Sequence, residues 1–277
     1  MNLQKSLTSP KTLTVALLMT AFYFYHLSSL STLAGRMDVK VSPWVFTHMF
    51  SQICFVANGF FMTALFSDLP NRDRQIYFVV IRSGRRNWLW GQVCSVITMA
   101  FLYTVFTFLL SIVALIPNVQ FTTQWGSVLK TLAVNRNAAA YYGTVIDFSI
   151  NESILSNFTA IGSTCISLGL FWLTTVFAGS LILCANAILK TGGGTILSGL
   201  FACMCFFAYY GGQFLFGSWI SYFSPYSWAT MYYLNWGYAG METPTPAYAV
   251  GSMLCASMLL CFLFIIVLSK RDVDTEG

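Results

Sequence analysis

Two histidines are the only side chains in the apolar stretches of this sequence that titrate near neutral pH. His26 lies within the first long apolar run, and His48 lies a few residues into the second. A histidine in such a place suits a hydrogen bond to a neighbouring helix, contact with a substrate, or a proton relay. The relay is the least favoured of the three, because neither run contains a carboxylate. We expect hydrogen bonds between helices first, and a substrate-lining role for the two rings second.

The sequence contains none of the short motifs that mark hydrolytic or nucleotide-binding sites. It has no Gly-Lys pair, so a GxxxxGK[ST] phosphate loop is absent, and it has neither HExxH nor GxSxG. The glycine run at residues 192–194 lacks the following lysine and is expected to form a turn between helices. Cys203 and Cys205 would diverge on a helix, which argues against a metal pair. We therefore expect no catalytic residue, metal or cofactor in this chain, and an outside source of energy.

Composition indicates an integral membrane protein. Hydrophobic residues make up 57% of the 277 residues and charged residues only 8%, which is far from the balance of a soluble domain. We expect an all-α protein in which residues 1–277 form a single transmembrane domain. Its six membrane helices are expected at residues 12–34, 45–67, 90–116, 159–189, 195–216 and 248–269. With both termini in the cytosol, ten of the fourteen lysines and arginines lie inside, as the positive-inside rule requires.

A basic segment separates the second and third expected spans and reads DLPNRDRQIYFVVIRSGRRNWLWG over residues 68–91. Pro70 and Asn71 suit the start of a helix, and Gly84 suits its end. The apolar block between them is bordered by arginines, which is typical of a short helix at a membrane face or against a partner. A solvated loop that merely obeys the charge rule is the alternative. We expect a cytosolic helix over residues 69–82.

Two other segments between expected spans have their own patterns. Residues 117–158 are expected outside the cell, with an amphipathic helix at 125–133 that lies flat on the membrane interface. Aromatic residues and glycines alternate from Tyr209 to Tyr238. Aromatic rings with a polar edge favour the headgroup level, and irregular backbone at that depth survives only where protein or water satisfies it. We expect re-entrant or interfacial helices between the fifth and sixth spans.

The order of these features resembles the permease subunit of a type-2 ATP-binding-cassette (ABC) exporter. The resemblance covers the layout of the whole chain. It rests on RSGRRNWLWGQ from Arg82 to Gln92, the short turn between the fourth and fifth spans, SPYSWA from Ser224 to Ala229 and SKRDVD from Ser269 to Asp274. In such permeases the segment after the second span is a coupling helix that docks into a separate ATPase subunit. The re-entrant helices before the last span close the outer exit.

The resemblance implies two groups of site residues. The ATPase-coupling residues would be Asp73, Ile76, Tyr77, Phe78, Ile81 and Arg82. The candidate substrate and exit-gate residues would be Trp219, Tyr222, Phe223, Trp228, His26 and His48. The resemblance also implies two permeases, identical or paralogous, and two ABC ATPase subunits in a lipid membrane, expected to be a bacterial plasma membrane. ATP and Mg²⁺ would bind to the ATPase, and no nucleic acid is expected as a partner.

The expected spans carry no ionic group, so a pathway between them would be lined by aromatic, Met, Ser and Thr side chains. Such a surface favours an amphipathic or apolar substrate, such as an antimicrobial-type peptide or a lipophilic drug. Two alternatives remain. A non-transporting immunity or sensor protein could sequester a peptide without a coupling helix, and a membrane-embedded enzyme would need polar catalytic groups at one depth. Co-purification of an ATPase would separate the exporter from the other two.

Overall fold

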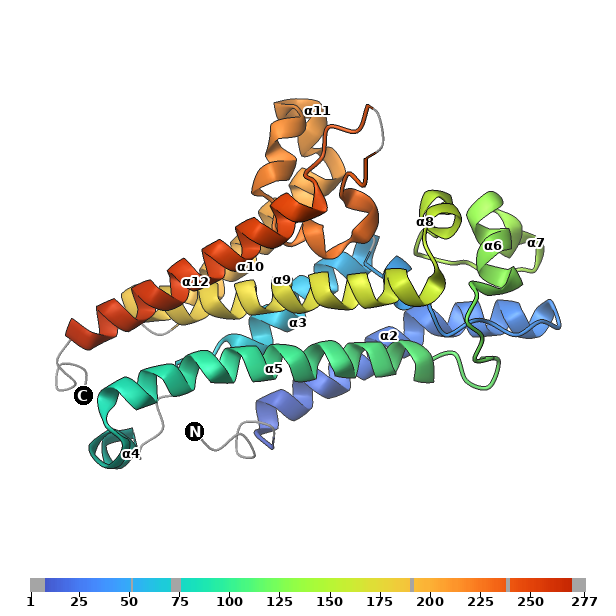
Figure 1. Cartoon of the computed structure of the whole chain (residues 1–277). Coiled ribbons are helices and arrows are strands. Elements are labelled where there is room, and N and C mark those ends of the chain that lie inside the picture. The colour runs from blue at the N-terminus through green and yellow to red at the C-terminus, as the bar shows by residue number, and fades with distance from the viewer. Residues whose placement is uncertain (1–7, 51, 71–75, 190–191, 238–239, 271–277) are drawn as a thin grey trace.

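The computed structural model describes residues 8–50, 52–70, 76–189, 192–237 and 240–270, and over these ranges it forms helices and no named strand. Five helices in the described part are long and apolar enough to cross a membrane. They are α2 (Pro10–Arg36), α5 (Arg85–Val113), α9 (Ala160–Leu189), α10 with its continuation (Gly193–Phe216) and α12 (Pro246–Lys270). The five run lengthwise along one bundle (Figure 1). The predicted all-α class is confirmed, and the helices fit a multi-pass membrane protein.

The second expected span, at residues 45–67, is wrong in its first third. Helix α3 covers only Gln52–Phe66, which is 15 residues. At 1.5 Å per residue it reaches about 22 Å, less than the roughly 30 Å of a bilayer's hydrocarbon core. The preceding residues form a single 3₁₀ turn, η1 (Phe46–His48).

The residues before α3 are apolar because protein, rather than lipid, covers them. Val45, Phe46 and Met49 are fully buried. The chain just before them is fixed to the α5–α9 loop (residues 114–159), since Trp44 Nε1 donates to the carbonyl of Thr122 at 2.6 Å. Hydropathy measures removal from water and does not distinguish burial in protein from burial in lipid, which explains why the expected helix is too long.

The remaining expected spans correspond to observed helices whose ends differ by a few residues. Helix α5 begins at Arg85 instead of residue 90. Gly84, directly before it, has a φ of +80° and so separates α5 from the preceding helix. The expected span at 195–216 is divided. Its α-helical part, α10 (Gly193–Phe207), continues as one π-helical turn, η2 (Ala208–Gly212), and then as α11 (Gln213–Phe216).

Helix α9 is central and packs against α3, α5, α10 and α12 (Figure 1). Small residues on α9 let its neighbours approach closely. A Cβ atom on Gly179 would lie 2.7 Å from Val96 of α5 and 3.2 Å from Phe66 of α3. Close approach at small residues is a common way for membrane helices to pack, because dispersion replaces the hydrophobic effect as the main attraction between them.

The α5–α9 loop carries three short helices, α6 (Gly126–Val134), α7 (Ala138–Tyr141) and α8 (Glu152–Asn157). They gather at one end of the bundle, which we call the α6 end (Figure 1). The expected amphipathic helix is therefore present as α6, but its apolar side does not lie on a membrane interface. Val128 and Leu129 are buried in the main core. Trp125, just before α6, is buried too and donates to the Phe158 carbonyl at 3.0 Å.

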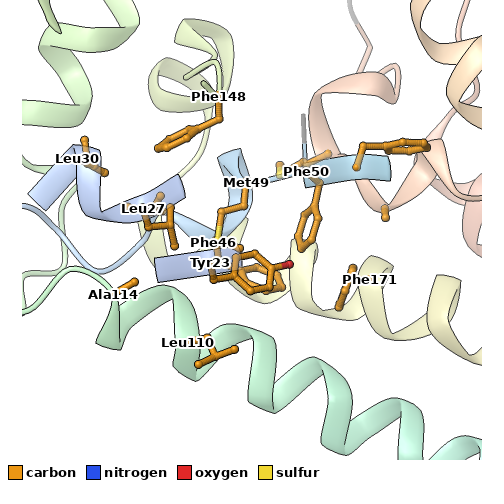
Figure 2. Close-up of a cluster of buried hydrophobic side chains, with 14 of the residues drawn as sticks. Tyr23, Leu27, Leu30, Phe46, Met49, Phe50, Leu110, Ala114, Phe148 and Phe171 are labelled. Carbon is orange, nitrogen blue, oxygen red and sulfur yellow. The ribbon is translucent and has the colours of Figure 1, made fainter. Parts of the chain in front are cut away.

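Aromatic rings fill the core beneath this loop. Phe50 stacks on Phe171 of α9 with ring centroids 4.5 Å apart, and Phe46 meets both rings edge-on. Figure 2 shows these rings beside Tyr23 of α2, with Phe148 of the α5–α9 loop pointing into the same core from above. The loop is thus part of the folded core.

The opposite end of the bundle carries α4 (Ile76–Ser83), together with the start of α2 and the end of α12 (Figure 1). We call it the α4 end. The coupling helix expected over 69–82 differs at its start, because Leu69 and Pro70 are not helical. Residues 71–75 lie outside the described residues.

Candidate functional site

The segment that holds α4 is anchored by a buried asparagine. Asn186 of α9 is 1% exposed, and its Nδ2 donates to the Leu69 carbonyl at 2.6 Å. Its Oδ1 accepts from the backbone N–H groups of Gly194 at 2.8 Å and Gly192 at 3.2 Å. One amide therefore joins the chain leaving α3 to the turn between α9 and α10.

The glycines of this turn meet a steric requirement. Gly192 has a φ of +98°, a left-handed conformation that glycine adopts at little cost. A Cβ atom on Gly194 would lie 2.6 Å from the Ile182 carbonyl oxygen and 2.8 Å from Asn186 Oδ1. Of the expected turn, residues 190–191 lie outside the described residues, and Gly193 and Gly194 already belong to α10, so the lack of a side chain on Gly194 lets the start of that helix approach Asn186.

Two basic side chains fix the same region to other helices. Lys11 of α2 pairs with Asp68 at 2.8 Å and also donates to the Ser67 hydroxyl. Arg85, at the start of α5, donates to the carbonyl of Leu268 near the end of α12. The segments on both sides of α4 are therefore tied to α2, α9 and α12.

The predicted coupling residues lie in or beside α4. Ile76, Tyr77 and Phe78 fall in its helical backbone, and Asp73 lies outside the described residues. Ile81 is 83% exposed, and Arg82 is also exposed. An apolar side chain left this open at the end of a bundle is a candidate contact for another protein.

The chain between α11 and α12 contains a buried, irregular stretch, residues 224–231. It includes the 3₁₀ turn η4 (Ser227–Ala229) and the start of η5 (Met231–Tyr233). Ser224 and Ser227 each donate to the Cys205 carbonyl of α10 at 3.3 Å, and Thr230 donates to the Phe50 carbonyl at 2.9 Å. Other parts of the protein thus satisfy the polar groups of this irregular stretch.

A chain of three hydroxyl groups runs from this stretch into the bundle. The Tyr226 hydroxyl lies 3.0 Å from Ser198 Oγ of α10, which lies 2.9 Å from Thr63 Oγ1 of α3. All three side chains are buried. Tyr226 belongs to the SPYSWA segment, whose sequence alone did not predict this contact.

The four predicted aromatic gate residues divide into two kinds. Trp219, Tyr222 and Phe223, all in η3 (Ser218–Phe223), are exposed, whereas Trp228 is 2% exposed. Trp228 donates from Nε1 to the Ser221 carbonyl at 2.9 Å, so its role is to hold η3 against η4. Tyr248 of α12 brings the two kinds together, because its ring meets both Tyr222 and Trp228 edge-on.

The two histidines have separate surroundings. His26 is buried against Phe22, and its Nδ1 lies 3.3 Å from Oδ2 of Asp147, a carboxylate supplied by the α5–α9 loop. His48 lies in η1, outside the membrane-spanning helices, with its ring 5.2 Å from that of Trp125. Burial lowers the pKa of His48 to about 3, so its ring is neutral at physiological pH. His48 precedes α3 and does not lie within that helix.

The α5–α9 loop also reaches the chain between α11 and α12. Burial raises the pKa of the Tyr232 hydroxyl, and both the nearby charge of Arg136 and a hydrogen bond with Ser149 oppose that rise. Phe158 and Trp236 meet edge-on, with ring centroids 5.0 Å apart. The loop therefore covers α2 through Asp147 and the α11–α12 chain through these contacts.

Sequence reasoning missed one further polar centre, Asn58 of α3. Its Oδ1 accepts from the hydroxyl of Tyr23 at 2.7 Å and from that of Tyr103 at 3.0 Å, and its Nδ2 donates to the Cys54 carbonyl. The signal was available, since Asn58 and Asn186 are amides flanked on both sides by apolar residues. Such a residue is costly in a membrane unless it bonds another helix.

These polar groups hold helices together and offer little chemistry. Among the described residues, no group of three or more His, Cys, Asp or Glu side chains is placed to hold a metal ion. The described carboxylates that form ion pairs, Asp68 and Asp147, lie at opposite ends of the bundle.

Comparisons of the chain with protein-family models, with curated proteins and with solved structures find no match.

Proposed function

We propose that this chain is the membrane-spanning permease subunit of a type-2 ABC exporter, driven by a separate ATPase. The observation that carries the proposal is that α4 has an exposed apolar side chain while the chain on both sides of this helix is firmly attached to the bundle. It is a short helix between two apolar helices, it leaves Ile81 exposed, and the chain on either side of it is tied to α2, α9 and α12. A helix that receives force from a partner needs this combination of an open contact and firm attachment.

In this proposal two ATPase subunits bind and hydrolyse ATP with Mg²⁺, and each docks against the α4 of one permease copy. A second permease, identical or paralogous, completes the unit. The α4 end then faces the cytosol with both termini, in agreement with the excess of lysine and arginine there. The α6 end faces outward from what is expected to be a bacterial plasma membrane.

The proposed substrate is an amphipathic or apolar molecule, such as an antimicrobial-type peptide or a lipophilic drug. Trp219 and Phe223 are exposed and their rings meet edge-on at 6.0 Å, which gives a polarizable surface without ionic groups. Such a surface attracts the apolar side of a peptide that already partitions into the bilayer. Export then consists of lifting that peptide out of the membrane as the 224–231 stretch moves.

Co-purification tests the docking claim. An ABC ATPase from the same genome is co-expressed with the chain, and pull-down is compared for wild type and Ile81→Glu, alone and with Tyr77→Glu and Phe78→Glu. We expect the ATPase to be lost while membrane insertion is kept. Val134→Glu is the matched control, because Val134 is 77% exposed on α6 at the other end of the bundle. Undiminished pull-down by the triple variant contradicts the proposal.

A further inference from the structure

Helix α3, helix α10 and the 224–231 stretch are joined by side-chain hydrogen bonds. Thr63 of α3, Ser198 of α10 and Tyr226 form the chain of three hydroxyls, with separations of 2.9 and 3.0 Å. Ser198 is fully buried and stands between the other two. The Ser198 hydroxyl oxygen of α10 therefore links this helix both to α3 and to the 224–231 stretch.

Further hydrogen bonds join pairs of these elements on either side of the three hydroxyls, and Asn186 of α9 takes part in them at the α4 end. Toward the α6 end, Ser224 and Ser227 donate to the Cys205 carbonyl of α10, and Thr230 donates to the Phe50 carbonyl just before α3. Toward the α4 end, Thr195 of α10 and Asn186 both reach the Ser67 carbonyl, at 3.5 and 3.4 Å.

The burial of these bonds determines how the elements can move. A hydroxyl or carbonyl that loses its partner inside a membrane protein finds no water to replace it, so separation leaves polar groups unsatisfied. Ser224 and Ser227 are almost completely buried, so a shift of the stretch relative to α10 separates both hydroxyls from the Cys205 carbonyl and leaves them only their 2.6 Å contact with each other. A shift of all three elements together keeps the bonds between them, and it changes those that Asn186 of α9 makes to Ser67, Leu69 and Gly194.

We propose that α3, α10 and the 224–231 stretch move as one body, with Ser198 as the positioning residue. The inference rests on the proposed function, since it names how force applied at α4 reaches the other half of the protein. The chain leaving α3 leads to α4. A displacement of α4 is thereby delivered to the 224–231 stretch through α3 and the hydroxyl chain, rather than through the long loops at the α6 end.

A native thiol reports on this body directly. Cys205 is fully buried under the 224–231 stretch, whereas Cys203, two residues earlier on α10, is exposed. The unmodified permease, with its ATPase in liposomes, is treated with a membrane-permeant maleimide at rest and during ATP turnover. Peptide mass spectrometry then reads both cysteines on the same peptide, so Cys203 is the internal control. We expect Cys205 to stay protected in both states, and its labelling during turnover overturns the inference.

Removal of the hydroxyls supplies the second arm. Ser198→Ala and Tyr226→Phe each remove one of the three linked hydroxyls. Each should raise Cys205 labelling by about threefold, the factor that a typical hydrogen bond between membrane helices represents. Because both changes remove the Ser198–Tyr226 contact, the double variant should label no more than Ser198→Ala alone, which already removes both contacts of Ser198. Thr104→Val of α5 is the control, since the buried Thr104 hydroxyl donates to the Ala100 carbonyl of its own helix.

The two claims fail in different ways. If an ATPase does not bind or turn over, the proposed function is wrong, and the comparison of Ser198→Ala, Tyr226→Phe and their combination at rest still decides the inference. The role of the three hydroxyls is contradicted if the effects of Ser198→Ala and Tyr226→Phe add up in the double variant. It is also contradicted if Thr104→Val raises Cys205 labelling as much as these variants do. If Ser198→Ala does not fold, Ser198→Thr retains a hydroxyl and should keep both protection and peptide-stimulated ATPase activity.

Discussion

Oδ2 of Asp147 lies 3.3 Å from Nδ1 of His26, and this contact joins the α5–α9 loop to the interior of α2. The His26 side chain is 6% exposed and that of Asp147 is 48% exposed, so the pair lies at the boundary between the bundle and its surroundings. The Asp147 carboxylate gives His26 an acidic partner that its own helix does not supply. The ring lacks an acidic neighbour within the helices and receives one from a segment about 120 residues later in the chain.

Asp147→Asn should loosen the loop without unfolding the bundle. Because Asp147 is half exposed, solvent screens the pair, and we expect a loss of no more than about 1 kcal/mol in the free energy of unfolding. Limited proteolysis of the α5–α9 loop should be faster than in wild type. Asp38→Asn is the control, since Asp38 is exposed beyond the end of α2. Equal proteolysis of the two variants would count against a role for the pair.

Asn58→Leu should destabilise the bundle more than the loss of either tyrosine hydroxyl alone. The change leaves the hydroxyls of Tyr23 and Tyr103 buried without their shared acceptor, at a cost of about 1–3 kcal/mol. Thermal unfolding in detergent should show Tyr23→Phe and Tyr103→Phe as milder variants, because Asn58 Oδ1 keeps one donor in each. A triple variant that removes both hydroxyls as well as Asn58 should recover part of the loss. No recovery would argue that Asn58 acts through volume alone.

Two glycines of α10 should respond oppositely to the same change. Gly194→Ala places a Cβ atom 2.6 Å from the Ile182 carbonyl oxygen, so the turn and Asn186 must shift, at a cost of about 1–3 kcal/mol. Gly199→Ala has nothing within 4 Å of the new atom and should be neutral or slightly stabilising, since alanine favours the helix. Thermal unfolding of the two variants provides the comparison. A stable Gly194→Ala protein would show that the α9–α10 turn is more adaptable than its contacts indicate.

The long helices could be predicted from sequence because their signal is local. A run of apolar residues of sufficient length between polar breaks predicts α9 at 159–189, and the structure places it at Ala160–Leu189. The same reasoning fails at residues 45–50, where the covering surface is the α5–α9 loop and α9. That information lies more than 60 residues away in the chain, so no local window contains it.

The candidate site was harder to predict than the helices because its contacts join distant segments. Asn186 meets Leu69, Tyr226 meets Ser198, and Asp147 meets His26. The exposed aromatic residues of η3 could be found from composition, since a ring with a polar edge is informative by itself. The distinction between Trp228, which is buried, and Trp219, which is exposed, depends on the fold of the 217–231 chain and has no counterpart in the residue types.

That distinction leads to a prediction about transport. Trp228→Ala removes a buried ring and its hydrogen bond to the Ser221 carbonyl, so the protein should lose about 3–5 kcal/mol of stability. Trp219→Ala and Phe223→Ala remove exposed rings and should leave the melting temperature near that of wild type. If these rings contact the substrate, the two exposed variants should weaken the stimulation of ATPase activity by amphipathic peptides in liposomes.

The control for the transport assay is Phe214→Ala. Phe214 of α11 is 93% exposed, so its loss removes an equally open ring from the neighbouring helix rather than from η3. We expect this variant to keep both stability and peptide stimulation. The gate assignment is contradicted if Phe214→Ala weakens stimulation as much as Trp219→Ala does, because the effect would then reflect aromatic surface in general. It is also contradicted if only a soluble sugar or ion stimulates the ATPase and the η3 variants leave that stimulation unchanged.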